Sequence, residues 1–224
     1  MYSVAIDGPA GAGKSSIAKM VSKKTGVLYL DTGALYRAFG YYFIKNNISV
    51  EDLIEVEDAI LKCDIKIFCE DEQKVFVNGK RVDKLIRNDE VSMVASLISK
   101  NITIRKHLLK IQREYAKNNS VIMDGRDIGT VVLPDADLKI FLTARVEVRA
   151  KRRFEELLKN GYDIDYEEVL KSIKERDLND SKREIAPLKV ADDAVVIDTS
   201  DISLEESVNK VIFLIRKINL EEHC

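Results

Sequence analysis

Residues 8–15 read Gly8-Pro9-Ala10-Gly11-Ala12-Gly13-Lys14-Ser15, which fits the pattern G-x-x-x-x-G-K-[ST]. A short apolar run at residues 2–6 precedes this stretch and is typical of a buried strand. Residues 16–24 follow it and carry Ile17, Met20 and Val21 at helical spacing. A strand, a glycine-rich loop and a helix in this order indicate a phosphate-binding loop, and the alternative is a chance glycine-rich turn.

The residue types of this loop suit the chemistry of phosphate binding. Glycines let backbone N–H groups turn toward one point without steric clashes, and the helix N-terminus adds its positive dipole end there. Lys14 is expected to reach the β- and γ-phosphates of a nucleotide such as ATP. The hydroxyl of Ser15, or of its neighbour Ser16, is expected to face Mg²⁺.

Composition excludes several classes of partner. The chain has 224 residues, 46% hydrophobic and 33% charged, with a formal charge of −2, so no global basic field favours nucleic acid or an acidic membrane. The N-terminus enters the first strand directly and no apolar run could span a bilayer, so we expect a cytoplasmic protein without signal peptide or anchor. Cys63, Cys69 and Cys224 are too few for a disulfide framework or zinc site; we expect the first two to pack as small hydrophobes and Cys224 to lie on a loose tail.

Strands and helices alternate along most of the chain. Helical spacing is clearest at residues 104–115 and 204–218. Short apolar runs without polar alternation, as expected for strands covered on both faces, lie at residues 3–7, 27–30, 120–124, 138–142 and 194–198. The pattern predicts an α/β fold: a doubly wound, five-stranded parallel sheet with the phosphate loop at the carboxyl end of a strand.

Two segments interrupt this alternation. Residues 64–82 alternate at period two around Asn78-Gly79, a strong type I′ hairpin signal, and predict antiparallel strands at 65–68, 74–77 and 80–82. Residues 145–194 hold two charge-rich helices before the last strand. We therefore expect a core of residues 1–36, 109–148 and 186–224, an inserted acceptor-binding lobe at 37–108 and a short helical lid at 149–185.

A second cluster follows the second strand and reads Asp31-Thr32-Gly33-Ala34-Leu35-Tyr36-Arg37. A strand that ends in Asp-Thr-Gly and opens a helix places Thr32 and Arg37 near a second anion site. The alternative is an N-cap formed by Asp31 or Thr32, with Arg37 solvated.

A third cluster follows the third core strand and reads Asp124-Gly125-Arg126-Asp127-Ile128-Gly129-Thr130. Asp124 ends a hydrophobic strand, where a carboxylate can orient Mg²⁺ or its water. Arg126 and Asp127 then belong to the same carboxyl edge as the phosphate loop. The alternative is a solvated loop with an internal ion pair.

Arginines and other charges gather in the two helices before the last strand. Arg149 and Arg153 are four residues apart on one helical face, and their donor forks would suit a triphosphate. Arg145 and Arg152 belong to the same run, and residues 174–183 form a second charged segment. Both stretches are also compatible with an ordinary solvated surface.

Together these clusters make the chain resemble the cytidylate kinases of bacteria, the (d)CMP kinase branch of the nucleoside monophosphate kinases. The resemblance runs nearly end to end, and its carriers are residues 6–15, 30–37, 124–132 and 174–188. Thr32 stands where many members carry serine, and Ser15-Ser16 follows Lys14 where others have Gly-Thr. The second departure leaves open which hydroxyl meets the metal.

The resemblance implies a role for each matching residue. Lys14, Arg126 and Arg183 would be catalytic, and Ser15 and Asp124 would hold the metal. The donor ATP would be bound by Gly8, Pro9, Ala10, Gly11, Ala12, Gly13, Lys14, Ser15, Ser16, Arg149 and Arg153. Cytosine would be held by Ser96, Arg105 and Asp127, the acceptor phosphate by Thr32, Arg37 and Arg126, the ribose side by Arg176 and Asp180, and the phosphates again by Arg183.

The implied activity is direct, in-line transfer of the ATP γ-phosphoryl group to CMP or dCMP, with Mg²⁺ and no covalent intermediate. We expect a monomer whose partners are these nucleotides. Another small P-loop kinase, acting on UMP, AMP or a small metabolite, would share residues 8–15 but need a different acceptor pocket. A GTPase-type switch is disfavoured, because Asn209-Lys210 continues with Val211-Ile212 and no N-K-x-D motif follows the phosphate loop.

Overall fold

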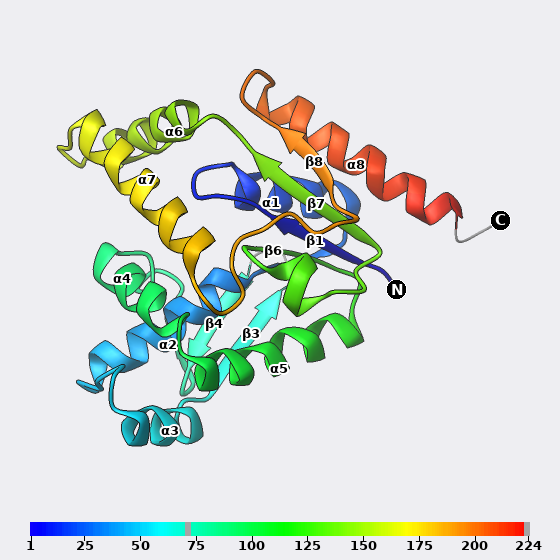
Figure 1. Cartoon of the computed structure of the whole chain (residues 1–224). Coiled ribbons are helices and arrows are strands. Elements are labelled where there is room, and N and C mark those ends of the chain that lie inside the picture. Colours follow the sequence, from blue (N-terminus) through cyan, green and yellow to red (C-terminus); the bar gives the residue numbers. More distant parts are fainter. Residues whose placement is uncertain (70–72, 222–224) are drawn as a thin grey trace. The chain divides into compact units, whose positions relative to one another are not determined.

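The computed structural model describes residues 1–69 and 73–221, so the prediction made for Cys224 lies outside the described residues. The predicted α/β fold is confirmed: the larger sheet has five strands in the order β2-β6-β1-β7-β8 (Figure 1). Its strands are β1 (Ser3–Asp7), β2 (Leu28–Asp31), β6 (Val121–Gly125), β7 (Leu138–Thr143) and β8 (Val195–Asp198). Every predicted core strand is therefore present, with bounds shifted by at most one residue.

The chain separates into two compact units. The first comprises Leu28–Val121 together with Met1, and the second comprises Tyr2–Val27 and the described residues from Ile122 onward. In the described part of the chain, no helix combines the length and the apolar character that crossing a membrane would require.

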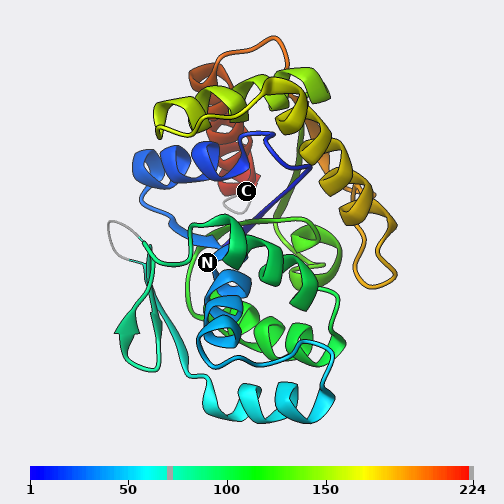
Figure 2. The same ribbon diagram turned by 90° about the vertical axis from the view of Figure 1, so that its left-hand side faces the viewer.

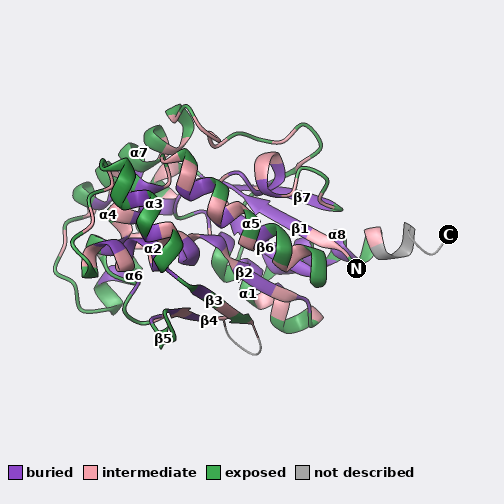
Figure 3. Ribbon diagram, turned by 90° about the horizontal axis from the view of Figure 1, so that it is seen from below, coloured by how far each residue is buried: buried purple, intermediate pink, exposed green. Residues whose placement is uncertain are grey.

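The second unit is built around β1, which pairs in parallel with β7, and β7 pairs in parallel with β8. Figure 3 shows that β1 and β7 are mostly buried. Side chains such as Ile6, Ile140 and Leu142 have almost no exposed surface. The helices of this unit are α1 (Lys14–Thr25), α6 (Val146–Lys159), α7 (Tyr166–Lys182) and α8 (Leu204–Glu221). Continuous apolar strands are what the sequence predicts for a sheet covered by helices.

The two charge-rich helices predicted before the last strand are α6 and α7, which lie side by side (Figure 1). Their contact is apolar: Ala150 and Leu157 of α6 are buried with Val169 and Ile173 of α7. Charged residues therefore occupy the remaining faces of both helices. This small core fixes α7 on α6 and so sets where the charged residues near the end of α7 lie.

The first unit combines helices with the small antiparallel sheet. Its helices are α2 (Thr32–Lys45), α3 (Leu53–Lys62), α4 (Asp89–Ile98) and α5 (Ile102–Asn118), seen in Figure 2. Phe39 and Phe43 of α2 form the centre of its core, which also buries Cys63, as expected for a small hydrophobe. Cys69 is only partly buried. Burial raises the pKa of the Cys63 thiol to about 12.

The predicted meander is present as β3 (Ile65–Cys69), β4 (Gln73–Val77) and β5 (Lys80–Arg81), paired in that order. Asn78 and Gly79 both have positive φ, 47° and 75°, which the type I′ turn requires. The hairpin signal in the sequence thus fixed both the turn and the register that pairs Lys80 with Val77.

The segment that follows β6 has a conformation that the sequence prediction did not include. After β6 the chain forms a short π-helix, η1 (Ile128–Val132), of a kind that is often found at functional sites. Asp127 occupies its N-cap position. Five residues with no apolar periodicity of their own carry no helix signal, because the turn depends on partners far away in the chain.

The phosphate loop itself gives a test of the fold. Gly8 has φ +148°, and a Cβ there would lie 1.9 Å from the main-chain oxygen of Leu142 in β7. Gly8→Ala should therefore lower the free energy of unfolding by roughly 3 kcal/mol or more, because the oxygen belongs to a strand that cannot move aside. Urea denaturation measures this change.

Gly26→Ala is the matched control, because Gly26 also has positive φ (75°) but a Cβ there would meet nothing within 4 Å. Only the backbone strain of a left-handed alanine remains, about 1–2 kcal/mol. Equal losses in the two variants would contradict the predicted clash with Leu142.

Candidate active site

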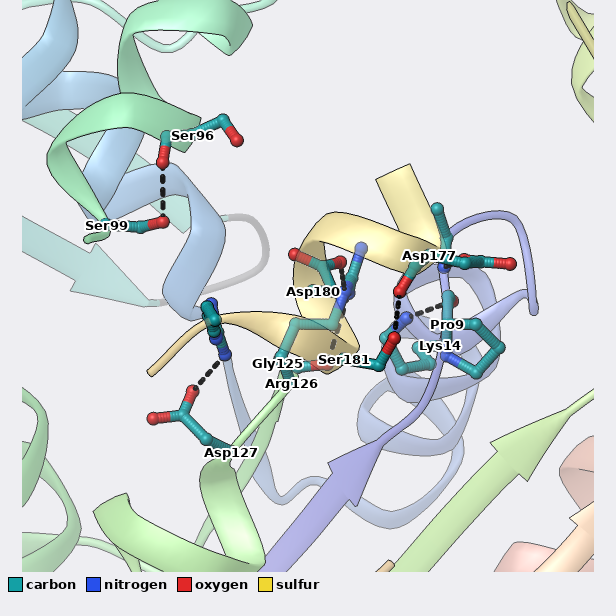
Figure 4. Close-up of polar contacts among 12 residues, drawn as sticks. Pro9, Lys14, Ser96, Ser99, Gly125, Arg126, Asp127, Asp177, Asp180 and Ser181 are labelled. Atoms are coloured by element: carbon teal, nitrogen blue, oxygen red, sulfur yellow. Dashed lines mark hydrogen bonds and ion pairs between the residues drawn. The ribbon is translucent and has the colours of Figure 1, made fainter. Parts of the chain in front are cut away.

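The phosphate loop connects β1 to α1 within the second unit. Gly11 and Gly13 have positive φ, and Gly13 is the residue that precedes the first turn of α1. Lys14 is buried, and its ammonium group donates a hydrogen bond of 2.7 Å to the carbonyl oxygen of Pro9 (Figure 4). The loop therefore folds back on its own lysine, and the ammonium group is held against the loop backbone.

The surroundings of Lys14 disfavour the charged form of its side chain. Burial lowers the pKa of its ammonium group well below the ordinary value of 10.5, and Arg126 lowers it further. The carboxylate of Asp124 opposes this shift, and Arg176 adds to it. Lys14, Arg126 and Arg176, three predicted nucleotide-binding residues, thus belong to one region of concentrated positive charge. Such a region favours a polyanionic ligand.

Ser15 and Asp124 lie together, as the prediction of a shared metal site requires. The hydroxyl of Ser15 donates a 2.7 Å hydrogen bond to a carboxylate oxygen of Asp124. Asp124 is buried near the end of β6, whereas Ser15 stands in the first turn of α1 and is exposed. Ser16, the alternative metal-facing hydroxyl, is also exposed, and no bond of its side chain to Asp124 accompanies that of Ser15.

Arg149 is placed at the phosphate loop, although its immediate partners are protein groups. Its guanidinium group donates to the carbonyl oxygens of Ala10 (2.9 Å) and Ala144 (2.8 Å). It also forms a 2.6 Å ion pair with Asp177 of α7, and Asp177 in turn accepts a hydrogen bond from the N–H of Ala10. Arg153, predicted to share this role, is partly exposed and pairs with Glu156 along its own helix.

Two further arginines of the second unit pair with carboxylates. Arg126 donates to Asp180 of α7 over 2.6 Å (Figure 4). Arg183 lies 3.6 Å from the carboxylate of Asp127 and also donates to the carbonyl oxygen of Ala186. The structure thus pairs Arg126 with Asp180 and Arg183 with Asp127. The sequence indicated these residues but not which of them contact each other.

Asp7 was not predicted as a site residue, yet it holds η1 in place. One carboxylate oxygen accepts from the N–H of Ile128 (2.8 Å) and the other from the N–H of Gly129 (2.7 Å). The pKa of Asp7 is raised to about 6, because burial raises it more than these two hydrogen bonds lower it. The only sequence signal was a carboxylate at the end of the apolar run before the phosphate loop.

In the first unit, the Asp-Thr-Gly motif opens α2. Asp31 caps this helix by accepting from the N–H of Ala34 (3.0 Å), which confirms the capping role, and its other oxygen pairs with Arg37 at 2.7 Å. Arg37 is therefore not simply solvated. Thr32 is buried. The side-chain amide of Gln73 in β4 bonds the main-chain N–H and oxygen of Asp31, which ties the small sheet to this motif.

The other predicted acceptor residues of the first unit form a second group. Arg105 is buried, donates to the carbonyl oxygen of Ser99 (3.2 Å), and stacks 5.8 Å from the ring centre of Tyr36. The Ser99 hydroxyl donates to the carbonyl oxygen of Ser96 (2.8 Å). Ser96 and Arg105 are thus linked through Ser99, on the α4–α5 connection.

Comparison with known proteins places this geometry in a family. The model of the family described as cytidylate kinase matches residues 4–217. The chain belongs to the cytidylate kinase family. A cytidylate kinase of Caldicellulosiruptor bescii is 53% identical over 216 residues, covering 96% of each chain, and one of Bacillus subtilis is 46% identical over 211 residues, covering 94% of each. An uncharacterized protein from Eubacterium ventriosum has a similar fold, with TM-score 0.52, 12% identity and coverage of 96% of this chain and 99% of that one.

The contacts of Arg149 lead to a prediction about stability. Arg149→Met should lower the free energy of unfolding by about 2–3 kcal/mol, because Asp177 loses its partner while it stays largely buried. Arg153→Met removes an exposed pair with Glu156 and should cost less than about 1 kcal/mol. Urea denaturation of both variants tests the difference, and similar values for the two would mean that Arg149 does not hold the phosphate loop to α7.

Proposed function

We propose that this member of the cytidylate kinase family transfers the γ-phosphoryl group of ATP to CMP and dCMP, giving CDP or dCDP and ADP. The observation that carries the proposal is the buried Lys14 beside the Ser15–Asp124 pair, in a chain that matches the family from residue 4 to 217. A lysine within a phosphate loop and a hydroxyl–carboxylate pair are the parts that phosphoryl transfer needs.

The same pair suits Mg²⁺. Ser15 and Asp124 offer hard oxygen donors within one hydrogen bond of each other, and Mg²⁺ in such sites takes few protein ligands beside phosphates and water. When bound there, Mg²⁺ would neutralise charge on the transferring phosphates. The Ser15–Asp124 contact favours Ser15 over Ser16 as the hydroxyl that faces it.

For the acceptor, we propose the residue roles that the family resemblance implies. Thr32, Arg37 and Arg126 hold the phosphate of CMP, and Arg176 and Asp180 lie on its ribose side. Cytosine is read by Ser96, Arg105 and Asp127: a carboxylate accepts from its amine, while a guanidinium donates to N3 and O2. Because no base contact needs the 2′-hydroxyl, dCMP should serve as a second acceptor.

The reaction itself needs no general base, since the acceptor phosphate is already an anion near neutral pH. One of its oxygens attacks the γ-phosphorus of ATP in line, and the bond to the β-phosphate oxygen breaks to release ADP. Lys14, Arg126 and Arg183 stabilise the charge of the transition state, and Arg149 holds the phosphate loop in shape. We also propose that residues 37–108 form the acceptor-binding lobe and that residues 149–185 form a lid. We further propose that the enzyme is a monomer located in the cytoplasm.

The donor site is tested by Lys14→Ala. Removing a charge that contacts the transferring phosphates should lower kcat by about 10³-fold. The measurement is ADP release in a coupled assay with CMP. Lys19→Ala, an exposed lysine of the same helix, is the control and should keep full activity. If Lys14→Ala retains more than a tenth of the turnover, Lys14 does not contact the phosphates as proposed.

The acceptor is tested by base choice. Uracil presents an oxygen where cytosine presents its amine, and an N–H at N3. The Asp127 carboxylate would then face another hydrogen-bond acceptor, and the Arg105 guanidinium group another donor. Unpaired buried polar groups are costly, and kcat/KM for UMP should be about 10² to 10⁴-fold below that for CMP. Asp127→Asn can donate to the uracil oxygen and should narrow this ratio, mainly by losing activity with CMP.

The measurement is kcat/KM for CMP, dCMP and UMP with the wild type and with Asp127→Asn. Equal use of CMP and UMP by the wild type would refute the proposed acceptor. A ratio that does not change in Asp127→Asn would show that Asp127 does not read the base.

A further inference from the structure

Asp127 occupies the N-cap position of η1 but does not behave as a cap. An N-cap aspartate ordinarily accepts from the N–H two or three residues ahead of it, which here belong to Gly129 and Thr130. Asp127 makes no such capping hydrogen bond. Its carboxylate lies instead 3.6 Å from the guanidinium group of Arg183.

The capping is done by Asp7, which comes from a different strand. Asp7 ends β1, 120 residues before Asp127 in the sequence, and accepts from the N–H groups of both Ile128 and Gly129 at 2.8 and 2.7 Å. The N–H of Gly129 is one of those that Asp127 would otherwise bind. Asp7 is 4% exposed, so these two amides have no access to water as a substitute acceptor.

The space around this contact is limited. A Cβ at Gly129 would lie 3.1 Å from the side chain of Lys139 and 3.4 Å from the carboxylate of Asp7. The backbone of η1 therefore packs closely against the side chain of Lys139 and lies in contact with Asp7. On the other side, Asp7 leads directly into the phosphate loop through Gly8, where the space is smaller still: a Cβ there would lie 1.9 Å from the main-chain oxygen of Leu142. Asp7 thus has little freedom to move, and neither has the turn that it binds.

We propose that Asp7 is a positioning residue for cytosine recognition: by capping η1 in place of Asp127, it keeps the Asp127 carboxylate out of the cap, in an orientation from which it can contact the base. This inference rests on the proposed role of Asp127 as the residue that reads cytosine. Without Asp7, the amide of Gly129 needs another acceptor, and the side chain of Asp127, two residues earlier, is the one that an N-cap residue ordinarily supplies. A carboxylate that turns back to cap its own helix no longer faces a base.

The test is the ratio of kcat/KM for CMP to that for UMP in Asp7→Asn. An asparagine accepts from one amide but presents an N–H to the other, so Asp127 is drawn into the cap. The ratio should fall by about tenfold, chiefly through a higher KM for CMP, because a small misplacement of a binding group has effects of this size. A merely structural defect, or a changed charge beside Lys14, would lower turnover with both acceptors alike and leave the ratio unchanged.

Two controls sharpen the experiment. Asp52 also accepts from two backbone amides, those of Ile54 and Glu55, but at the start of α3, so Asp52→Asn should leave the ratio unaltered. In the double variant Asp7→Asn with Asp127→Asn, the ratio should equal that of Asp127→Asn alone, because Asp7 acts only through Asp127. Additive effects of the two substitutions, or an unchanged ratio in Asp7→Asn, would overturn the inference.

A second measurement does not depend on an Asp7 variant that folds. Amide hydrogen exchange at Ile128 and Gly129 should be equally slow in the wild type and in Asp127→Asn, since Asp7 binds both amides. Faster exchange in Asp127→Asn would show that Asp127 is the cap and would refute the inference. Failure of the wild type to phosphorylate CMP would instead refute the proposed function, so the two failures are distinguishable.

Discussion

Positive charge is concentrated around the phosphate loop, and the folded chain compensates it with its own carboxylates. Lys14 is buried among charges that lower the pKa of its ammonium group, with Arg126 the largest of them after burial itself. Three arginines of the second unit are each paired with a carboxylate: Arg126 with Asp180, Arg149 with Asp177, and Arg183 with Asp127. Burying unpaired guanidinium groups would cost far more than such pairs do. The acidic residues near the end of α7 are therefore a structural requirement of a site built for polyanions.

The second requirement is steric, and it explains why the loop needs glycine where it does. Gly8 leaves no room for a side chain beside the backbone of Leu142, and a Cβ at Gly11 would lie 3.1 Å from that of Arg149. The loop is thus wedged between β7 and α6. Because Arg149 bonds the carbonyl oxygen of Ala10 and Asp177 bonds its N–H, the same loop residue is held by two helices. Loop geometry and charge compensation are satisfied by the same side chains.

The separation of contacting residues along the chain determines which features could be predicted from the sequence. Apolar runs, the G-x-x-x-x-G-K-[ST] pattern and Asn78-Gly79 are local signals, and they predicted the sheet, the phosphate loop and the hairpin with small errors at the element ends. The contact between Ser15 and Asp124 was also predictable, because both motifs belong to carboxyl ends of parallel strands. Asp7 and Asp177 were missed, since their partners lie 121 and 167 residues away and nothing in their own neighbourhood marks them. The π-helix was missed for the same reason.

Carboxylate pairing has a consequence for how nucleotides would bind. A phosphate that reaches Arg126 or Arg149 meets a guanidinium group already desolvated and fixed in orientation by an aspartate, so little ordering remains to be done on binding. The phosphate must, however, share or replace that aspartate, and a dianionic phosphate has the advantage over a single carboxylate charge. Weak monoanions do not have that advantage. Asp177 and Asp180 therefore hold these arginines in place and would compete with any anion that reaches them, so a dianionic phosphate group should bind there better than a singly charged anion.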